Sequence, residues 1–334
     1  MEEVFSIVLV IIGALVGAGF ASGQEIYSFF YSYGNIGIIG IIITCCLISL
    51  MVYKSLKIIY SNKINSYDEF LSIFIKNEKV TKAISVVINI LLLVTFYIMV
   101  AGFGAYFEQE IGIKRIIGSS ILVIMTTIVF FTSVKGFLKV SEYIVPLLII
   151  FIVIIGGTNL LTINSNTEIL CIKKGWLSSS IIYCSYNMIL LVPALISLRK
   201  QITKQKNIKY ISVLCGIFMI IMSLLLYMLL MKVDVELSTL EMPIMYVVRT
   251  FFKQYKTIYA FIILMSIFTT AISIGIGLLQ NISGDRRRYT HFVIFMCITS
   301  LIVSNLGFSK LVNLMYPIFG YVGIIQLIYI INKK

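Results

Sequence analysis

Charged residues are scarce in this chain of 334 residues: they make up 12% of it, with 14 acidic side chains and a single histidine. Soluble domains carry about 25% charged residues. Hydrophobic residues make up 60% of the chain, and the mean hydropathy is +1.03. No soluble core buries that many apolar side chains, so the composition predicts an all-α integral membrane protein built from long apolar helices.

Further shortages exclude several function classes. The six cysteines include no CxxC pair and most lie inside apolar runs, so the sequence predicts no disulfide framework, no cofactor and no transition-metal site. The net charge of +13 comes from basic residues in short loops, which argues against nucleic acid as a partner. No nucleophile and base pair up, and the loops are too short for a catalytic domain, so an enzyme is not predicted.

The sequence is rich in apolar runs that are long enough to cross a hydrocarbon layer of about 30 Å. Ten such runs predict ten transmembrane helices in one domain that covers residues 1–334. They are 4–32, 36–60, 82–107, 115–133, 141–162, 176–198, 208–231, 256–282, 289–305 and 309–331.

The positions of lysine and arginine predict the orientation, because basic loops are retained on the cytoplasmic side of a membrane. With the amino terminus inside, 18 of the 27 basic residues fall in inside loops. The outside loops hold the rest and also carry acidic residues such as Glu108, Glu110 and Glu241. We therefore expect both termini to be cytoplasmic in an inner (plasma) membrane.

Ten helices divide into two sets of five, at about 4–162 and 176–332. An odd number of helices per set makes the second set enter the membrane from the opposite face, so an inverted repeat is geometrically possible. The opening run of each set also contains a candidate interruption. Interrupted helices at corresponding positions mark the binding sites of many transporters.

The first interruption is the segment GAGFASG, Gly17 to Gly23. Each glycine there costs about 1 kcal/mol of helix stability relative to alanine. Unwinding would direct amides toward an anion and carbonyls toward a cation. Close packing is the alternative, because Gly13-xxx-Gly17 and Gly19-xxx-Gly23 are patterns that let helices touch.

The second candidate interruption lies in the sixth run. Tyr183, Ser185, Tyr186 and Asn187 lie near its middle, ahead of Pro193, which cannot donate a backbone hydrogen bond. Polar side chains at that depth need partners or water. The cluster indicates either a contribution to a solute site or hydrogen bonds between helices.

Hydroxyl groups recur at helical spacing in the eighth run, at Ser266, Thr269, Thr270 and Ser273. Oxygen ligands on one helical face suit a hard monovalent cation such as sodium, when backbone carbonyls complete the shell. The alternative is that each hydroxyl bonds a preceding carbonyl of its own helix.

Glu25 follows the first interruption directly. A carboxylate in the first turn of a half-helix is favoured by the helix dipole and competes with an anionic substrate group. Glu25 is therefore a capping carboxylate, a partner for a substrate ammonium, or a group that cycles a proton.

The string GAGFASGQE resembles the signature of the YkvI-like membrane proteins, which are placed in the amino acid, polyamine and organocation transporter superfamily. The resemblance covers the whole chain and implies a LeuT-like fold, a 5+5 inverted repeat with discontinuous helices 1 and 6. It also implies a sodium site between the first and eighth helices. The superfamily motifs for that site are matched by Gly13, Val16, Ser266, Thr269 and Thr270.

The resemblance nominates a solute site as well. Similar proteins bind an amino-acid carboxylate on first-helix amides, here those of Gly17, Ala18 and Gly19. The sixth and third helices complete such sites, here through Ser185, Tyr186, Asn187 and Tyr97. Gln24-Glu25 departs from the aromatic or proline-containing continuation of well-studied amino-acid carriers, which argues against simple amino-acid specificity.

These observations predict a secondary transporter, specifically a sodium-coupled symporter of a small amino acid or related organic solute. The resemblance implies that helices 1, 2, 6 and 7 rock against helices 3, 4, 8 and 9. Two alternatives stay open, a proton-coupled transporter that uses Glu25 and a non-transporting receptor that binds a solute in the same cavity. The lipid bilayer is the other expected partner. The sequence does not specify the oligomeric state.

Overall fold

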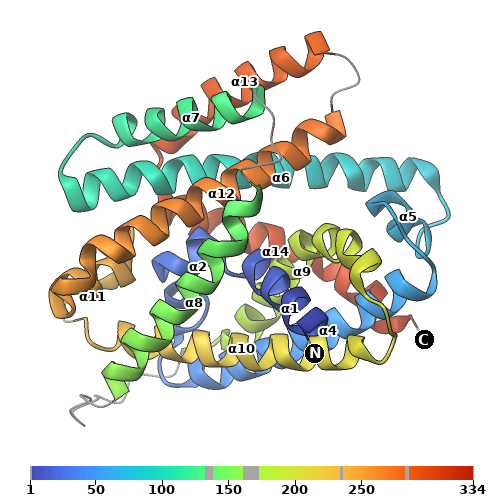
Figure 1. Cartoon of the computed structure of the whole chain (residues 1–334), viewed down its shortest axis with the longest axis horizontal. Coiled ribbons are helices and arrows are strands. Elements are labelled where there is room, and N and C mark those ends of the chain that lie inside the picture. The colour runs from blue at the N-terminus through green and yellow to red at the C-terminus, as the bar shows by residue number, and fades with distance from the viewer. Residues whose placement is uncertain (1, 132–137, 161–172, 234–235, 283–285, 334) are drawn as a thin grey trace.

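A computed structural model describes residues 2–131, 138–160, 173–233, 236–282 and 286–333 (Figure 1). Every regular element within these ranges is helical, as the composition predicts. The α-helices are α1 (Glu2–Leu15), α2 (Ala18–Ser22), α3 (Gln24–Phe29), α4 (Ile36–Ser61), α5 (Tyr67–Ser72), α6 (Glu78–Tyr106), α7 (Arg115–Phe131), α8 (Leu138–Leu160), α9 (Trp176–Leu198), α10 (Asn207–Leu230), α11 (Pro243–Phe251), α12 (Lys256–Ile282), α13 (Arg286–Ser304) and α14 (Phe308–Asn332).

Six of the described helices are long and apolar enough to cross a membrane, namely α4, α6 with its π-helical extension η2 (Phe107–Ile111), α9, α10, α12 and α14. Three shorter helices, α1, α7 and α8, are also apolar. The chain is therefore a multi-pass membrane protein. Each of the ten predicted runs falls on these helices, on α2 and α3, or on α13, while the ten-span count stays a prediction. The predicted ends at 132–133 and 161–162 lie outside the described residues.

The helices form two groups. Helices α6, α7, α12 and α13 pack on one another, and α6, α7 and α13 occupy the upper part of Figure 1. Helices α1, α4, α9 and α10 form the second group, with α4 and α10 along the lower edge. Helix α8 contacts α12 on one side and α1 and α10 on the other, and α14 packs mainly on α9.

The first apolar run is broken, as its glycines predict. Helix α1 ends at Leu15, and Gly17 is extended, with φ −84° and ψ −170°. The five-residue α2 then ends at Gly23, whose φ of 83° is a conformation that glycine adopts at little cost. Close packing explains Gly13, because a Cβ there would press on Val145 of α8, but a Cβ at Gly17 would meet nothing within 4 Å.

The predicted interruption of the sixth run is wrong. Helix α9 runs unbroken from Trp176 to Leu198 and includes Pro193. Ser185 and Asn187 are satisfied within the helix, because the Ser185 hydroxyl donates to the Ile181 carbonyl at 2.8 Å and the Asn187 amide donates to the Tyr183 carbonyl at 2.9 Å. Hydrogen bonds of this kind remove the need for an unwound backbone. Only the first of the two discontinuous helices is therefore present.

Candidate functional site

Glu25 is the centre of the candidate site. It lies in the first turn of α3 and is only 1% exposed. The Tyr183 hydroxyl donates to its Oε2 at 2.8 Å, and the Tyr186 hydroxyl donates to its Oε1 at 3.0 Å. The two tyrosines are three residues apart on α9 and so share one helical face.

No ion pair is found for Glu25 among the described residues, whose ion pairs involve Glu108, Glu110 and Glu241. Its partners are tyrosine hydroxyls rather than backbone amides, so the capping interpretation has no support in the geometry. Burying a carboxylate is costly unless a partner compensates it. The site is thus chemically suited to a cation or a proton.

Aromatic rings enclose the carboxylate. The Phe29 ring lies 5.0 Å from the Tyr183 ring, centroid to centroid, and Phe30 lies 5.1 Å from it on edge. The Tyr186 ring is stacked on Tyr316 of α14 at 4.4 Å. We call Phe29, Tyr183, Tyr186 and Tyr316 the aromatic cluster of the site. Its members come from α3, α9 and α14, so three segments that are distant in sequence meet here.

The Glu25 side chain lies directly over α2. A Cβ added at Gly19 would overlap the Oε1 of Glu25, so a larger residue at this position would require the carboxylate to move. The glycine segment therefore has a specific role at this position, which is to let Glu25 fold back over the short helix α2. Gly17 and Ala18, the other predicted amide donors, begin the same short helix.

A cavity of about 380 Å³ lies beside the aromatic cluster, between α3, the beginning of α9 and α14. Ser28, Phe29, Ser179 and Asn313 are among its lining residues. Phe29 therefore borders the cavity and also contacts both tyrosines that hold Glu25. The Ser179 hydroxyl donates to the Phe29 carbonyl at 2.8 Å, which ties this end of α3 to α9.

Two of the sequence-predicted solute residues face other partners. Ser185 packs under Gly323 of α14, where a Cβ would overlap the Ser185 carbonyl. The Tyr97 hydroxyl lies 2.6 Å from the Thr299 Oγ1, which joins α6 to α13. Asn187 bonds its own helix, so Tyr186 is the member of the predicted sixth-helix set whose side chain contacts Glu25.

The predicted sodium residues lie at the end of α1, including Val16 just beyond it, and on α12. Helix α1 ends at Leu15, and a helix end leaves its last carbonyls without intrahelical partners, which applies to the stretch from Gly13 to Val16. On α12, Ser266 and Thr269 are buried, and Thr270 is half-buried. The Thr269 hydroxyl donates to the Ser266 carbonyl at 3.2 Å, the local bond that the alternative interpretation expects.

Helix α12 contacts the interrupted segment. The Tyr259 hydroxyl donates to the Ala21 carbonyl near the end of α2. Tyr259 is fully buried and its ring is stacked on Phe151 of α8 at 4.9 Å. This contact fixes α12 beside α2, on the opposite side of the break from α9.

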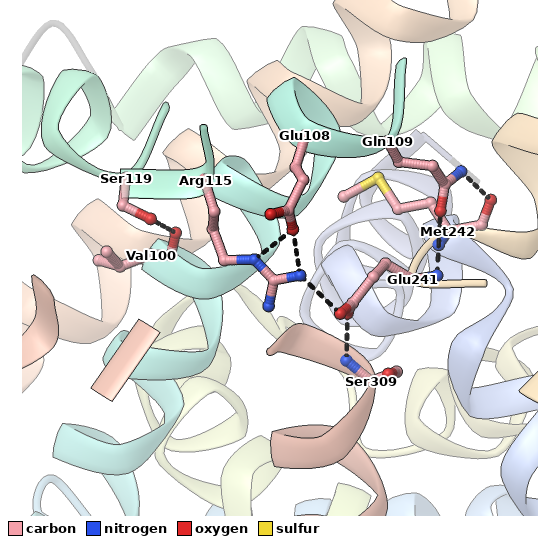
Figure 2. A network of polar contacts seen from close by, with 8 residues as sticks. All are labelled: Val100, Glu108, Gln109, Arg115, Ser119, Glu241, Met242 and Ser309. Carbon is pink, nitrogen blue, oxygen red and sulfur yellow. Dashed lines mark hydrogen bonds and ion pairs between the residues drawn. The ribbon is translucent and has the colours of Figure 1, made fainter. Parts of the chain in front are cut away.

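A polar network that the sequence analysis did not assign to the site holds α11 over the break (Figure 2). The Gln109 Oε1 accepts hydrogen bonds from the amides of Glu241 and Met242, both at 2.9 Å, and its Nε2 donates to the Met242 carbonyl at 3.3 Å. Two residues further along, Ile244 of α11 fills the space where a Cβ at Gly23 would be.

Arg115 extends this network to α14. Its guanidinium bonds Glu108 and, at 2.8 Å, Glu241, and the second oxygen of Glu241 accepts the Ser309 amide at 2.7 Å (Figure 2). We call Gln109, Arg115, Glu241 and their partners the α11 network. Acidic residues in this part of the chain signal polar contacts, but the sequence does not reveal their partners.

The sequence placed Tyr183 in the candidate polar cluster, although the family resemblance did not nominate it, and the sequence did not indicate Tyr316. The spacing indicates that Tyr183 lies at the site, because it precedes Tyr186 by three residues and so shares its helical face. No sequence pattern indicates Tyr316, because its position depends on how α14 packs against α9. That packing is close at Gly320, where a Cβ would overlap Ile182.

Comparison with known proteins gives two similar chains. No protein-family model matches the sequence. The chain is 31% identical over 334 residues to the uncharacterized membrane protein YkvI of Bacillus subtilis (strain 168), a match that covers 97% of this chain and 94% of the relative. It is 26% identical over 329 residues to the uncharacterized protein YyaD of the same organism, over 96% of this chain and 94% of the relative. Neither name specifies a substrate or a coupling ion.

Proposed function

We propose that this chain, which belongs to the family of the membrane protein YkvI, is a secondary active transporter, a sodium-coupled symporter of a small amino acid or related organic solute. The observation that carries the proposal is the broken first run, with Glu25 buried just beyond the break and bonded to two tyrosines of α9. Irregular backbone at membrane depth is tolerated where it lines a binding cavity.

The packing of the helices supports alternating access. The group of α1, α4, α9 and α10 corresponds to the predicted moving bundle, and the group of α6, α7, α12 and α13 corresponds to the predicted scaffold. The broken run contacts both groups, through α9 on one side and through Tyr259 of α12 on the other. A solute bound at the break would favour whichever arrangement of the two groups it contacts more strongly.

The register of α12 supports sodium as the coupling ion. From Tyr259, which bonds Ala21, Thr269 lies ten residues along α12, or about 15 Å. From Ala21 back to Gly13 is eight residues, which cross α2, the extended Gly17 and the end of α1. Because α1 and α12 run in opposite directions in the ten-span arrangement, the carbonyls at the end of α1 and the Thr269 hydroxyl lie on the same side of the contact between Tyr259 and Ala21.

Purified protein provides the test. A thermal-shift screen against amino acids, amines and osmolytes, in sodium and in potassium, first identifies a ligand that stabilises the folded state. Uptake of that ligand into sealed proteoliposomes is then measured with an inward sodium gradient and with an equal potassium gradient. We expect accumulation with sodium only, and uptake that ignores the sodium gradient would remove the coupling claim.

Proton coupling is a second candidate, favoured by the position of Glu25. A buried carboxyl group whose partners are hydroxyls is able to take up and release a proton during the transport cycle. In that case a pH gradient drives uptake without sodium, and Glu25→Gln abolishes it. Glu78→Gln is the matched control, because Glu78 is exposed at the beginning of α6. Ligand binding without any flux would instead identify a receptor.

A further inference from the structure

The cavity beside the site is electrically neutral. Its lining residues are tyrosines, serines, Asn313 and apolar groups, with no acidic or basic side chain among those described. Phe29 separates the cavity from Glu25, because its ring borders the cavity and is stacked on Tyr186, at 6.3 Å and an interplanar angle of 11°. A solute that moves from the cavity to Glu25 therefore meets its first charged group at the Glu25 carboxylate.

Glu25 also lies beside one of the residues that were expected to bind a substrate carboxylate. The Oε1 of Glu25 lies over Gly19, one of the three residues whose amides were nominated to bind that group. A second carboxylate at this position would face a like charge at short range, which is unfavourable in a buried site. The position selects for positive charge and against negative charge.

The groups around Glu25 also suit a cation. Aromatic faces attract ammonium groups, most strongly where water is excluded. If Phe29 swings into the cavity, the Tyr186 ring becomes more accessible next to the carboxylate, while it stays stacked on Tyr316. The neighbouring Gln24 is fully buried, and its Oε1 has no hydrogen-bond donor among the described residues. An acceptor without a donor is a costly arrangement that an N–H group of a ligand would relieve.

From these contacts we infer that the solute is an organic amine cation without a carboxylate next to its nitrogen. Glu25 binds the ammonium group, Tyr186 and Tyr316 stack beside it, and Phe29 moves aside to admit it. This inference rests on the proposed function only in taking Glu25 as part of a solute site. It narrows the solute from an amino acid to an amine.

Two sets of matched ligands test it. The first is ethanolamine, its neutral analogue ethylene glycol, and glycine, which adds a carboxylate. The second is choline, its neutral analogue 3,3-dimethyl-1-butanol, and glycine betaine. Binding to the purified full-length protein is measured by thermal shift and by calorimetry. We expect ethanolamine or choline to bind at least tenfold more tightly than both other members of its set. Glu25→Gln should abolish that preference, and Glu78→Gln should leave it unchanged.

A second pair of variants serves if Glu25→Gln does not fold. Tyr186→Leu removes the aromatic side chain and should weaken cation binding at least tenfold more than Tyr186→Phe, which removes only the hydroxyl that bonds Glu25. The inference is overturned if glycine or glycine betaine binds as well as its amine, if Glu25→Gln keeps the preference, or if no member of either set binds. Binding of an amine without flux into proteoliposomes would retain this inference and overturn the transport proposal. Uptake of glycine would overturn this inference and retain the transport proposal.

Discussion

The hydroxyl of Tyr183 donates a hydrogen bond to the Oε2 of Glu25 at 2.8 Å, across a separation of 158 residues. One helical turn further along α9, Tyr186 donates to the other oxygen of the same carboxylate at 3.0 Å. The buried Glu25 therefore joins the broken first run to the unbroken α9, in addition to the bond between Ser179 and the Phe29 carbonyl. Any movement of α3 relative to α9 has to break or rearrange these bonds.

Removing the Tyr183 hydroxyl should destabilise the fold, because the buried Glu25 carboxylate then has one hydrogen-bond donor fewer. We expect Tyr183→Phe to lower the free energy of unfolding by about 1–3 kcal/mol, because a charged acceptor loses a donor. The effect should nearly vanish when Tyr183→Phe is combined with Glu25→Gln, since the two residues share one interaction. Chemical unfolding in detergent micelles measures all four proteins. Additive losses in the double variant would show that the bond contributes little.

Two glycines of the first interruption provide a matched pair. A methyl group at Gly19 would overlap Glu25, whereas one at Gly17 would meet nothing within 4 Å. Gly19→Ala should therefore displace the carboxylate, destabilise the fold by about 1–3 kcal/mol and abolish ligand-induced stabilisation. Gly17→Ala should be tolerated. Thermal shifts with and without the best ligand compare the two variants, and equal losses would contradict the assigned geometry.

The sequence predicted the membrane class and the break because both depend on local composition. A hydrocarbon layer requires long apolar runs, and glycines such as Gly17 and Gly23 weaken a helix wherever they occur. The continuity of α9 was not predictable in this way. Whether Ser185 and Asn187 need an unwound backbone depends on which carbonyls they reach, and they reach those of their own helix.

The site was only partly predictable for a similar reason. Glu25 and Tyr186 were recognised because polar residues are rare in apolar runs. Tyr316 arrives by tight packing of α14 on α9 at Gly320 and Gly323, a contact between segments more than a hundred residues apart in the printed sequence. The bond between Tyr97 and Thr299 likewise depends on how α6 packs on α13.

The placement of Tyr97 makes a distinct prediction. Tyr97→Phe should lower stability by about 1 kcal/mol, the usual contribution of one hydrogen bond, because it removes the contact with Thr299. It should leave ligand affinity unchanged. Unfolding and calorimetric titration measure the two quantities separately. A loss of affinity with unchanged stability would return Tyr97 to the solute site.

The half-buried Gln109 should contribute more to the stability of the α11 network than the exposed Glu108 does. Gln109→Leu leaves the amides of Glu241 and Met242 without their acceptor, which should cost about 1–3 kcal/mol. The side chain of Glu108 is 50% exposed, so Glu108→Gln should cost less than about 1 kcal/mol. A cysteine placed at Ile244 should also react faster with a thiol reagent in the Gln109→Leu background. No difference between the two backgrounds would mean that the network does not hold α11.

Two hydroxyls of α12 separate ion binding from helix structure. If Thr269 is an ion ligand, Thr269→Ala should lower the apparent affinity for sodium about tenfold or more. Ser273→Ala is the control, because its hydroxyl lies one turn further on and donates to the Thr269 carbonyl at 2.9 Å. Titration of sodium at fixed ligand concentration gives the apparent affinity for the ion. Equal effects of both variants would assign the hydroxyls to local helix bonds.

Uptake into sealed proteoliposomes tests the central claim most directly, with the ligand that stabilises the purified protein best. An inward sodium gradient should produce accumulation above the level in protein-free vesicles, and Glu25→Gln should abolish it while Glu78→Gln does not. Binding of the same ligand without accumulation, under a sodium gradient and under a proton gradient alike, would contradict the proposal that this chain is a transporter.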